Sequence, residues 1–283
     1  MRGTFIALAL ASAAQAAQAQ TGLLVVAHGA GAEWNQRVRE TVAQVSWTGG
    51  PVSVAFLMGP EMTSAGWDSA TARLVRDGAR RIVVVPLMVS SHGGHYRQIR
   101  FLAGEIAEFP AELRAHDHGS YGPPPVPMSV TPALDGAPEL GQVLLDRWRA
   151  LPRARSRPLL LVAHGPVDEE ESARWLRDLE RAAAGIAREG TARVAVGLLR
   201  DDAPPPIRAA AIARLREQVG GLGSGDTVAV MPVLVSTGKI DRITIPRDLA
   251  GLPIDYSPVV LTPHPALARW IERVAIARDA STR

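Results

Sequence analysis

The same short pattern occurs once in each half of the chain. Residues 23–30, LLVVAHGA, match residues 159–166, LLLVAHGP, at six of eight positions. A second pair follows, since residues 228–237, VAVMPVLVST, echo residues 83–91, VVVPLMVSS. Self-similarity on this scale indicates that one domain was duplicated in tandem. The chain should therefore contain two copies of one fold.

Each half alternates short apolar runs with segments of helical spacing. In the first half we expect strands at 23–27, 51–58 and 82–89, and helices at 33–45, 69–78, 96–109 and 138–151. This alternation predicts an α/β fold with parallel strands, whose carboxyl ends all lie on one rim. The segment RARSRP, residues 153–158, has the composition of a linker. We therefore divide the chain into a leader (1–19), a first domain (20–152) and a second domain (153–283).

Histidines follow two of the predicted strands in the first half. His28 follows the strand at 23–27, and the run at 82–89 leads through Ser90 and Ser91 into His92, Gly93, Gly94 and His95. Ligands of open α/β sheets bind at the carboxyl ends of the strands. Imidazole binds transition metals and exchanges protons near neutral pH, and glycine lets a flat ligand approach the backbone. These loops suit the insertion of a metal into a tetrapyrrole, which requires both a ligand and a base.

Several of the histidines, His28 included, also allow simpler interpretations. His28 itself could merely cap the following helix, while His116 and His118 are either solvated or an accessory metal site. His164 repeats His28 in the second half, but Lys239 or Asp241 stands where His95 would be. Sequence alone therefore offers His164 no partner.

The first residues have the pattern of an export signal. Arg2 is followed by a short apolar stretch from Phe5 to Ala14 and then by Ala17-Gln18-Ala19, which has the form of a cleavage site. The apolar stretch is too short to span a membrane. We expect cleavage near Ala19 and a periplasmic or secreted protein; the alternative is an uncleaved N-terminus. The chain has no cysteine, which excludes disulfides and thiolate metal sites.

Charge and composition exclude some classes of partner. The formal net charge is only +3, and the arginines are scattered among acidic residues. Nucleic-acid binding needs a clustered basic face. We therefore expect no nucleic-acid partner, and the internal duplication favours a monomer.

The two histidine motifs resemble the class II tetrapyrrole chelatases, specifically the sirohydrochlorin cobaltochelatases and ferrochelatases. In that family a strand ends in His-Gly near the N-terminus, and a V-V-V-P-L strand is followed by Gly-Gly-His. Here the corresponding residues are LLVVAHGA with His28 and IVVVPLMVSSHGGH with His95. The tandem repeat is similar to the long, two-domain form of the family. The resemblance implies two four-stranded parallel sheets flanked by helices, with the tetrapyrrole bound between the halves.

The resemblance also implies an active site in the first half and a degenerate second half. His28 and His95 would be the metal ligands and proton acceptors. Co²⁺ or Fe²⁺ would be the substrate metal, without an organic cofactor. Family members commonly carry a glutamate where Met58 stands here; Glu61 is close enough to act as the acid–base group, and His92 could supply a third ligand.

Further residues of the histidine loop are candidates for binding the tetrapyrrole. They are Ser91, Gly93, Gly94 and Arg97. The guanidinium of Arg97, like that of Arg100, suits the carboxylates that decorate sirohydrochlorin. The alternative is a solvated helix face.

We expect a metal chelatase of the sirohydrochlorin type, in the synthesis of sirohaem or cobalamin. Tetrapyrrole synthesis is cytoplasmic, however, and a signal peptide fits poorly with that role. The second hypothesis is therefore an exported, non-catalytic carrier of metal or tetrapyrrole, which Met58 favours over the enzyme. In a third, both halves are structural and the histidines are incidental.

Overall fold

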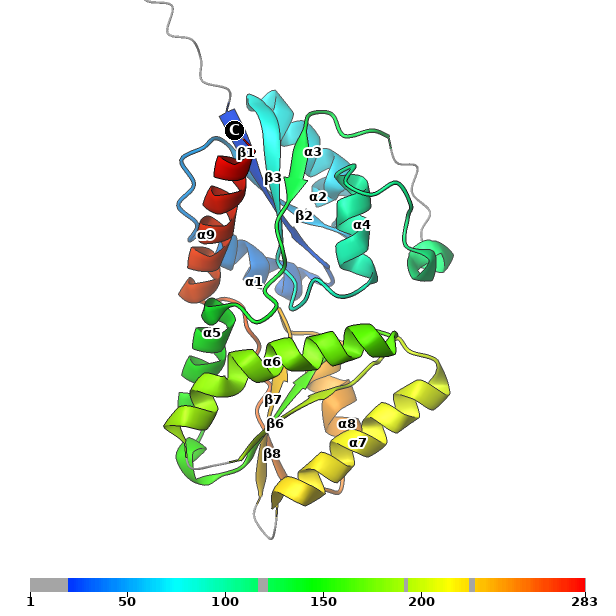
Figure 1. The fold of residues 1–283 in the computed structure, drawn as a ribbon, viewed down its shortest axis with the longest axis vertical. Helices are drawn as coiled ribbons and strands as arrows, with labels where there is room; N and C mark the ends of the chain where they lie inside the picture. Colours follow the sequence, from blue (N-terminus) through cyan, green and yellow to red (C-terminus); the bar gives the residue numbers. More distant parts are fainter. Residues whose placement is uncertain (1–19, 117–121, 191–192, 224–226, 283) are drawn as a thin grey trace, which may run out of the picture.

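The computed structural model describes residues 20–116, 122–190, 193–223 and 227–282. It has two lobes, each built on a parallel sheet with helices on both faces (Figure 1). The strands are β1 (Gln20–Ala27), β2 (Val52–Phe56), β3 (Ala79–Pro86), β4 (Met128–Val130), β5 (Leu159–Ala163), β6 (Val194–Leu198), β7 (Val228–Val233) and β8 (Ile254–Tyr256). The α-helices are α1 (Ala32–Val42), α2 (Met62–Ala65), α3 (Trp67–Arg76), α4 (Gly94–Leu102), α5 (Pro138–Arg149), α6 (Glu169–Glu189), α7 (Pro205–Gly223), α8 (Ile245–Asp248) and α9 (Pro265–Ser281). Two short 3-10 turns, η1 (Ala111–His116) and η2 (Ala154–Ser156), and a π-helical turn, η3 (Ile240–Thr244), complete the fold.

The two sheets repeat one topology. Their strand orders are β2-β1-β3-β4 and β6-β5-β7-β8, and every adjacent pair is parallel. The central strands are buried on both faces, which is why residues 23–27 and 159–163 read as continuous apolar runs. The predicted α/β fold with two four-stranded parallel sheets is confirmed.

The boundaries of some elements differ from the sequence prediction. Strand β4 lies between the helices predicted at 96–109 and 138–151, where the sequence predicted no strand. It is only three residues long, too short for a clear apolar run, and it pairs with β3. Helix α4 ends at Leu102 and not at Phe109. Gly104 follows with φ +75°, a left-handed conformation that ends a helix.

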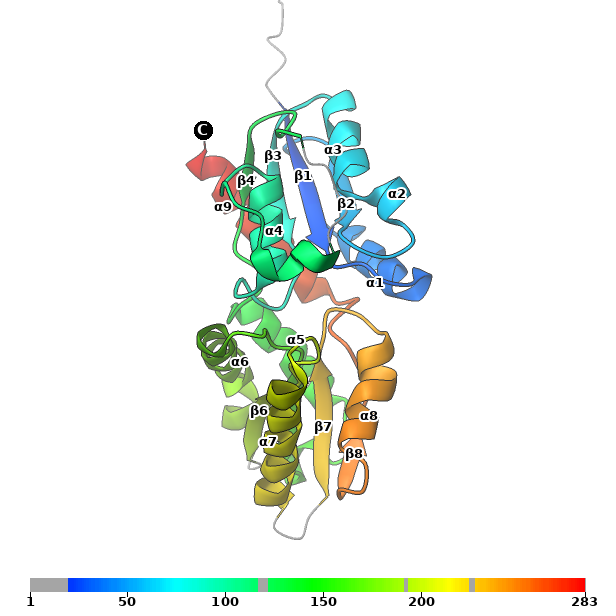
Figure 2. The same ribbon diagram turned by 90° about the vertical axis from the view of Figure 1, so that its right-hand side faces the viewer.

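The carboxyl ends of the strands in one lobe face those in the other. In both views β1 runs toward the second lobe and β7 runs toward the first (Figures 1 and 2). The loops that follow β1, β3 and β5 therefore meet between the lobes. Residues far apart in the sequence can share a site there.

The last helix of each half packs in the other lobe. Helix α5 leaves the first sheet and packs against α6, whereas α9 returns from the second sheet to β1 and β3 (Figure 1). Asp279 on α9 accepts hydrogen bonds from Thr21 at 2.8 Å and Arg81 at 2.7 Å. The division of the sequence at residue 152 stays a prediction, but in space the two halves exchange helices.

One apolar core is shared by both lobes. It joins the odd-numbered face of β1 to that of β5 through α1, α5, α6 and α9, with Trp148 and Trp270 fully buried in it. The even-numbered faces have separate cores, under α3 and α4 in the first lobe and under α7 and α8 in the second. The shared core fixes the two sheets relative to each other.

The predicted leader, residues 1–19, lies outside the described residues. Among the residues the structure does describe, no helix is both long and apolar enough to cross a membrane. Cleavage near Ala19 therefore stays a prediction.

The His-Gly pair after β1 depends on a glycine conformation. Gly29 has φ +85°, and a Cβ there would lie 2.4 Å from the carbonyl oxygen of Met58. Gly29→Ala should therefore lower the free energy of unfolding by about 2–4 kcal/mol, measured by urea denaturation. Gly31→Ala is the matched control, because a Cβ at Gly31 meets nothing within 4 Å. Equal stability of the two variants would contradict this account of the turn.

Candidate functional site

The structure brings His28 and His95 together. His28 follows β1, and His95 lies in the first turn of α4, after the loop that leaves β3. Their ring centroids are 4.7 Å apart and the rings are nearly perpendicular, at 87°. Two residues 67 positions apart in the chain thus form a pair, because β1 and β3 are neighbours in the sheet.

Hydrogen bonds fix the tautomer of each ring. His28 Nδ1 lies 2.8 Å from the carbonyl oxygen of Gly29, and His95 Nδ1 lies 3.0 Å from Gln98 Oε1. These oxygens can only accept, so Nδ1 carries the proton in both rings. Each Nε2 is therefore left with a lone pair, the arrangement that a metal-ligating histidine needs.

Burial keeps both imidazoles neutral. Desolvation, together with the nearby His95, lowers the pKa of His28 from 6.5 to about 4. Burial also lowers the pKa of His95, although its hydrogen bond to Gln98 opposes the shift. At neutral pH neither ring must lose a proton before binding a cation.

The second lobe contributes a histidine and a carboxylate. His164 Nδ1 donates to the carbonyl oxygen of Gly165 at 3.0 Å, as His28 does to Gly29. Its Nε2 lies 3.4 Å from Asp202 Oδ2. Both residues act electrostatically on His28 and on His95, which places them near the histidine pair.

Sequence reasoning missed the partner of His164. We expected Lys239 or Asp241 to stand opposite it, but Asp241 is fully buried and accepts hydrogen bonds from Thr237 and Gly238. The partner is Asp202, which follows β6 in the position where Glu61 and its neighbours follow β2. Aligning the segment after β6 with the segment after β2 could have identified Asp202, whereas aligning the histidine loops could not.

Glu61 holds the loop that carries His28. Its carboxylate is ion-paired with Arg39 and accepts from Asn35 at 2.9 Å. The buried Asn35, which sequence reasoning also missed, accepts in turn from the amide of Ala30 at 3.0 Å. The hydrogen bonds from Arg39 and Asn35 lower the pKa of Glu61, so it is ionised at neutral pH. Glu61 is thus linked through Asn35 to the loop that carries His28, and its acid–base role stays a prediction.

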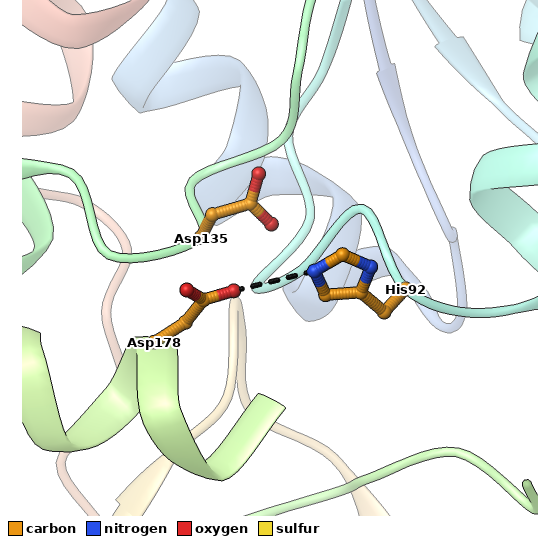
Figure 3. Close-up of side chains that lie close together, drawn as sticks. All are labelled: His92, Asp135 and Asp178. Atoms are coloured by element: carbon orange, nitrogen blue, oxygen red, sulfur yellow. Dashed lines mark ion pairs between the residues drawn. The ribbon is translucent and has the colours of Figure 1, made fainter. Parts of the chain in front are cut away.

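His92 makes its contacts with a different group of side chains. Its Nε2 lies 3.5 Å from Asp178 Oδ2 on α6, and the indole of Trp175 donates to its backbone carbonyl. Asp135, from the loop before α5, completes this group (Figure 3). The structure therefore gives His92 partners other than His28 and His95.

The remaining candidates of this loop differ in their surroundings. Ser91 Oγ donates to Asp135 at 2.8 Å, and Arg97 is ion-paired with Glu112 and with Glu171 of the second lobe. A Cβ at Gly94 would lie 2.8 Å from Glu112, whereas at Gly93 it would meet nothing within 4 Å. Ser91 and Arg97 thus anchor the loop, and Gly93 is where its backbone is most open. Their role in binding stays a prediction.

The accessory site suggested for His116 and His118 remains untested. His118 lies outside the described residues, as does the side chain of His116.

The first half of the chain matches the model of a known protein family. Residues 22–151 match the CbiX family, and they include His28, His95 and the whole first sheet. The first half of this chain is a CbiX domain. The resemblance to class II chelatases is thereby confirmed. Among curated protein sequences, none matches the chain.

Solved structures extend the likeness of the fold to both lobes. SirB from Bacillus subtilis, solved with Fe³⁺, aligns with a TM-score of 0.62 and 17% identity over 93% of this chain and 97% of SirB. The cobalt complex of the sirohydrochlorin chelatase SirB from B. subtilis subspecies spizizenii aligns with a TM-score of 0.59 and 16% identity, over 93% of this chain and 95% of that one. CbiX, the terminal enzyme of sirohaem biosynthesis in denitrifying bacteria, aligns with a TM-score of 0.55 and 16% identity, over 90% of this chain and 98% of that one. At these identities the likeness shows the fold, and the second lobe is thus chelatase-like as well.

The low pKa of His28 can be tested directly. Its ring resonances should titrate in NMR spectra with a midpoint of about 4. Between pH 6.5 and 4 the unfolded chain then binds more protons than the folded one, so stability falls as the pH falls. The free energy of unfolding should drop more between pH 7 and pH 5 in the wild type than in His28→Asn. A midpoint near 6.5 would show that His28 is solvated.

Proposed function

We propose that this chain is a metal chelatase that inserts a divalent metal into a sirohydrochlorin-like tetrapyrrole. The observation that carries the proposal is the pair of neutral histidines, His28 and His95, with both Nε2 atoms available and ring centroids 4.7 Å apart. Co²⁺ or Fe²⁺ is the substrate metal, consistent with the cations seen in SirB. Imidazole nitrogen suits both ions.

The reaction exchanges one divalent cation for two pyrrole protons. A ligand must therefore hold the metal loosely, and a base must remove the protons. His28, with a pKa of about 4, is a ligand at neutral pH and a weak base. We assign metal holding to His28 and His95, and proton removal to His164 supported by Asp202 across the interface between the lobes. A histidine oriented by a carboxylate is a common general base.

The tetrapyrrole would lie between the lobes, where the carboxyl ends of both sheets meet (Figure 2). In this arrangement the first lobe presents the metal and the second accepts protons from the other face of the macrocycle. The second lobe is then an active partner. This departs from the degenerate role that the resemblance implied.

The alternative is a carrier that binds metal or tetrapyrrole without turnover. Met58, which lies where the family has its glutamate, and the export signal predicted for residues 1–19 both favour it. Export, the identity of the tetrapyrrole and a monomeric state all stay predictions.

The first test follows metallation of sirohydrochlorin by Co²⁺ in the absence of oxygen. The wild type should accelerate metallation, and His95→Ala should abolish the acceleration, because a ligand is lost. His264→Asn is the control, since His264 caps α9 and an asparagine can still do so. A spectral shift that depends on His95 but shows no acceleration would favour the carrier. The absence of either response would refute both.

A second test separates holding the metal from removing protons. His164→Ala should lower the metallation rate by about 10²-fold, the usual contribution of a general base, while Co²⁺ binding is unchanged. Asp202→Asn should act in the same direction but less strongly. Asp201→Asn is the matched control, because Asp201 pairs with Arg208. An unchanged metallation rate in His164→Ala would show that His164 is not the base and that a group of the first lobe removes the protons.

A further inference from the structure

Three metal-ligating side chains converge outside the His28–His95 pair. His92 comes from the loop after β3, Asp135 from the loop before α5, and Asp178 from α6 (Figure 3). One ligand atom of each lies within 4.8 Å of the other two. Among the described residues, no other group of three meets this criterion. The cluster spans the boundary between the lobes, because α6 packs on the second sheet.

Each of the three residues is held in place by a contact outside the cluster. The amide and hydroxyl of Ser91 donate to Asp135, at 2.6 and 2.8 Å. The indole of Trp175 donates to the carbonyl of His92. Asp178 is largely buried, and Arg181 binds its Oδ1, which leaves Oδ2 directed toward His92. The donors are therefore oriented before any ligand arrives.

The spacing of the donors fits a small cation. Around a first-row ion with bonds of about 2.1 Å, neighbouring ligand atoms are about 3–3.5 Å apart. His92 Nε2 and Asp178 Oδ2 are already at 3.5 Å. The ligand atom of Asp135 lies within 4.8 Å of both.

The donor set also selects the class of ion. One imidazole nitrogen with two carboxylates suits a first-row transition metal, whereas Mg²⁺ and Ca²⁺ prefer oxygen alone. Two carboxylates carry two negative charges here. Arg181, which binds Asp178, is 66% exposed. A divalent ion would balance this charge from within the cluster.

We propose that His92, Asp135 and Asp178 bind one divalent first-row transition cation that ties the loop after β3 to α6. This ion is distinct from the metal held by His28 and His95. It would fasten the loop that carries His95 to the second lobe.

The test counts Co²⁺ ions by equilibrium dialysis of the full chain. We expect two per wild-type chain, one in His28→Ala/His95→Ala, and one in Asp178→Asn. Combining all three substitutions should leave none. His92→Gln is the second variant, and either single change at this site should weaken its binding at least about tenfold. Asp146→Asn is the matched control, because Asp146 also lies near a histidine, His264 at 3.4 Å, and among the described residues no third ligand group joins that pair.

A stability measurement gives an independent readout. In the His28→Ala/His95→Ala background, Co²⁺ should raise Tm, and Asp178→Asn should remove that rise. The same ion count in Asp178→Asn and His92→Gln as in the wild type, or a rise in Tm that persists in Asp178→Asn, would overturn the proposal. Neither result bears on metallation by His28 and His95, which the rate assay measures separately.

Discussion

Helices α5 and α9 cross between the lobes and hold the two sheets in a fixed relation. Each helix buries a tryptophan, Trp148 or Trp270, in the core that both sheets share. Arg273 on α9 is also ion-paired with Glu139 on α5, at 2.6 Å. Because interiors pack closely, the two sheets cannot turn freely against each other. The rims that carry the histidine loops are thereby held face to face.

Duplication gave the two rims the same backbone, and substitution gave them different chemistry. The His-Gly turn occurs in both lobes, with φ +85° at Gly29 and +78° at Gly165. In the first lobe the histidine faces a second histidine, whereas in the second lobe it faces a carboxylate. Two neutral imidazoles suit a cation, and an imidazole beside a carboxylate suits a proton. A duplicated chain can thus divide the two requirements of metal insertion between its halves.

The loop after β3 connects these features. Over a few residues it contributes Ser91, which anchors it to Asp135, then His92, which pairs with Asp178, and then His95, which pairs with His28. Arg97 adds an ion pair to Glu171 of the second lobe. The position of His95 therefore depends on contacts with α6 as well as on its own strand. Changes at the interface between the lobes should be felt at the histidine pair.

The duplicated α/β fold, the His-Gly turns and the pairing of His28 with His95 can be predicted from the amino-acid sequence. These follow from local patterns, because apolar runs define buried strands and parallel strands bring their carboxyl ends together. By contrast, three features are visible only in the folded chain: α5 and α9 exchange lobes, Asp202 pairs with His164, and His92 pairs with Asp178. Each of these depends on how the two halves of the chain pack against each other, and no periodicity within a single segment records that packing.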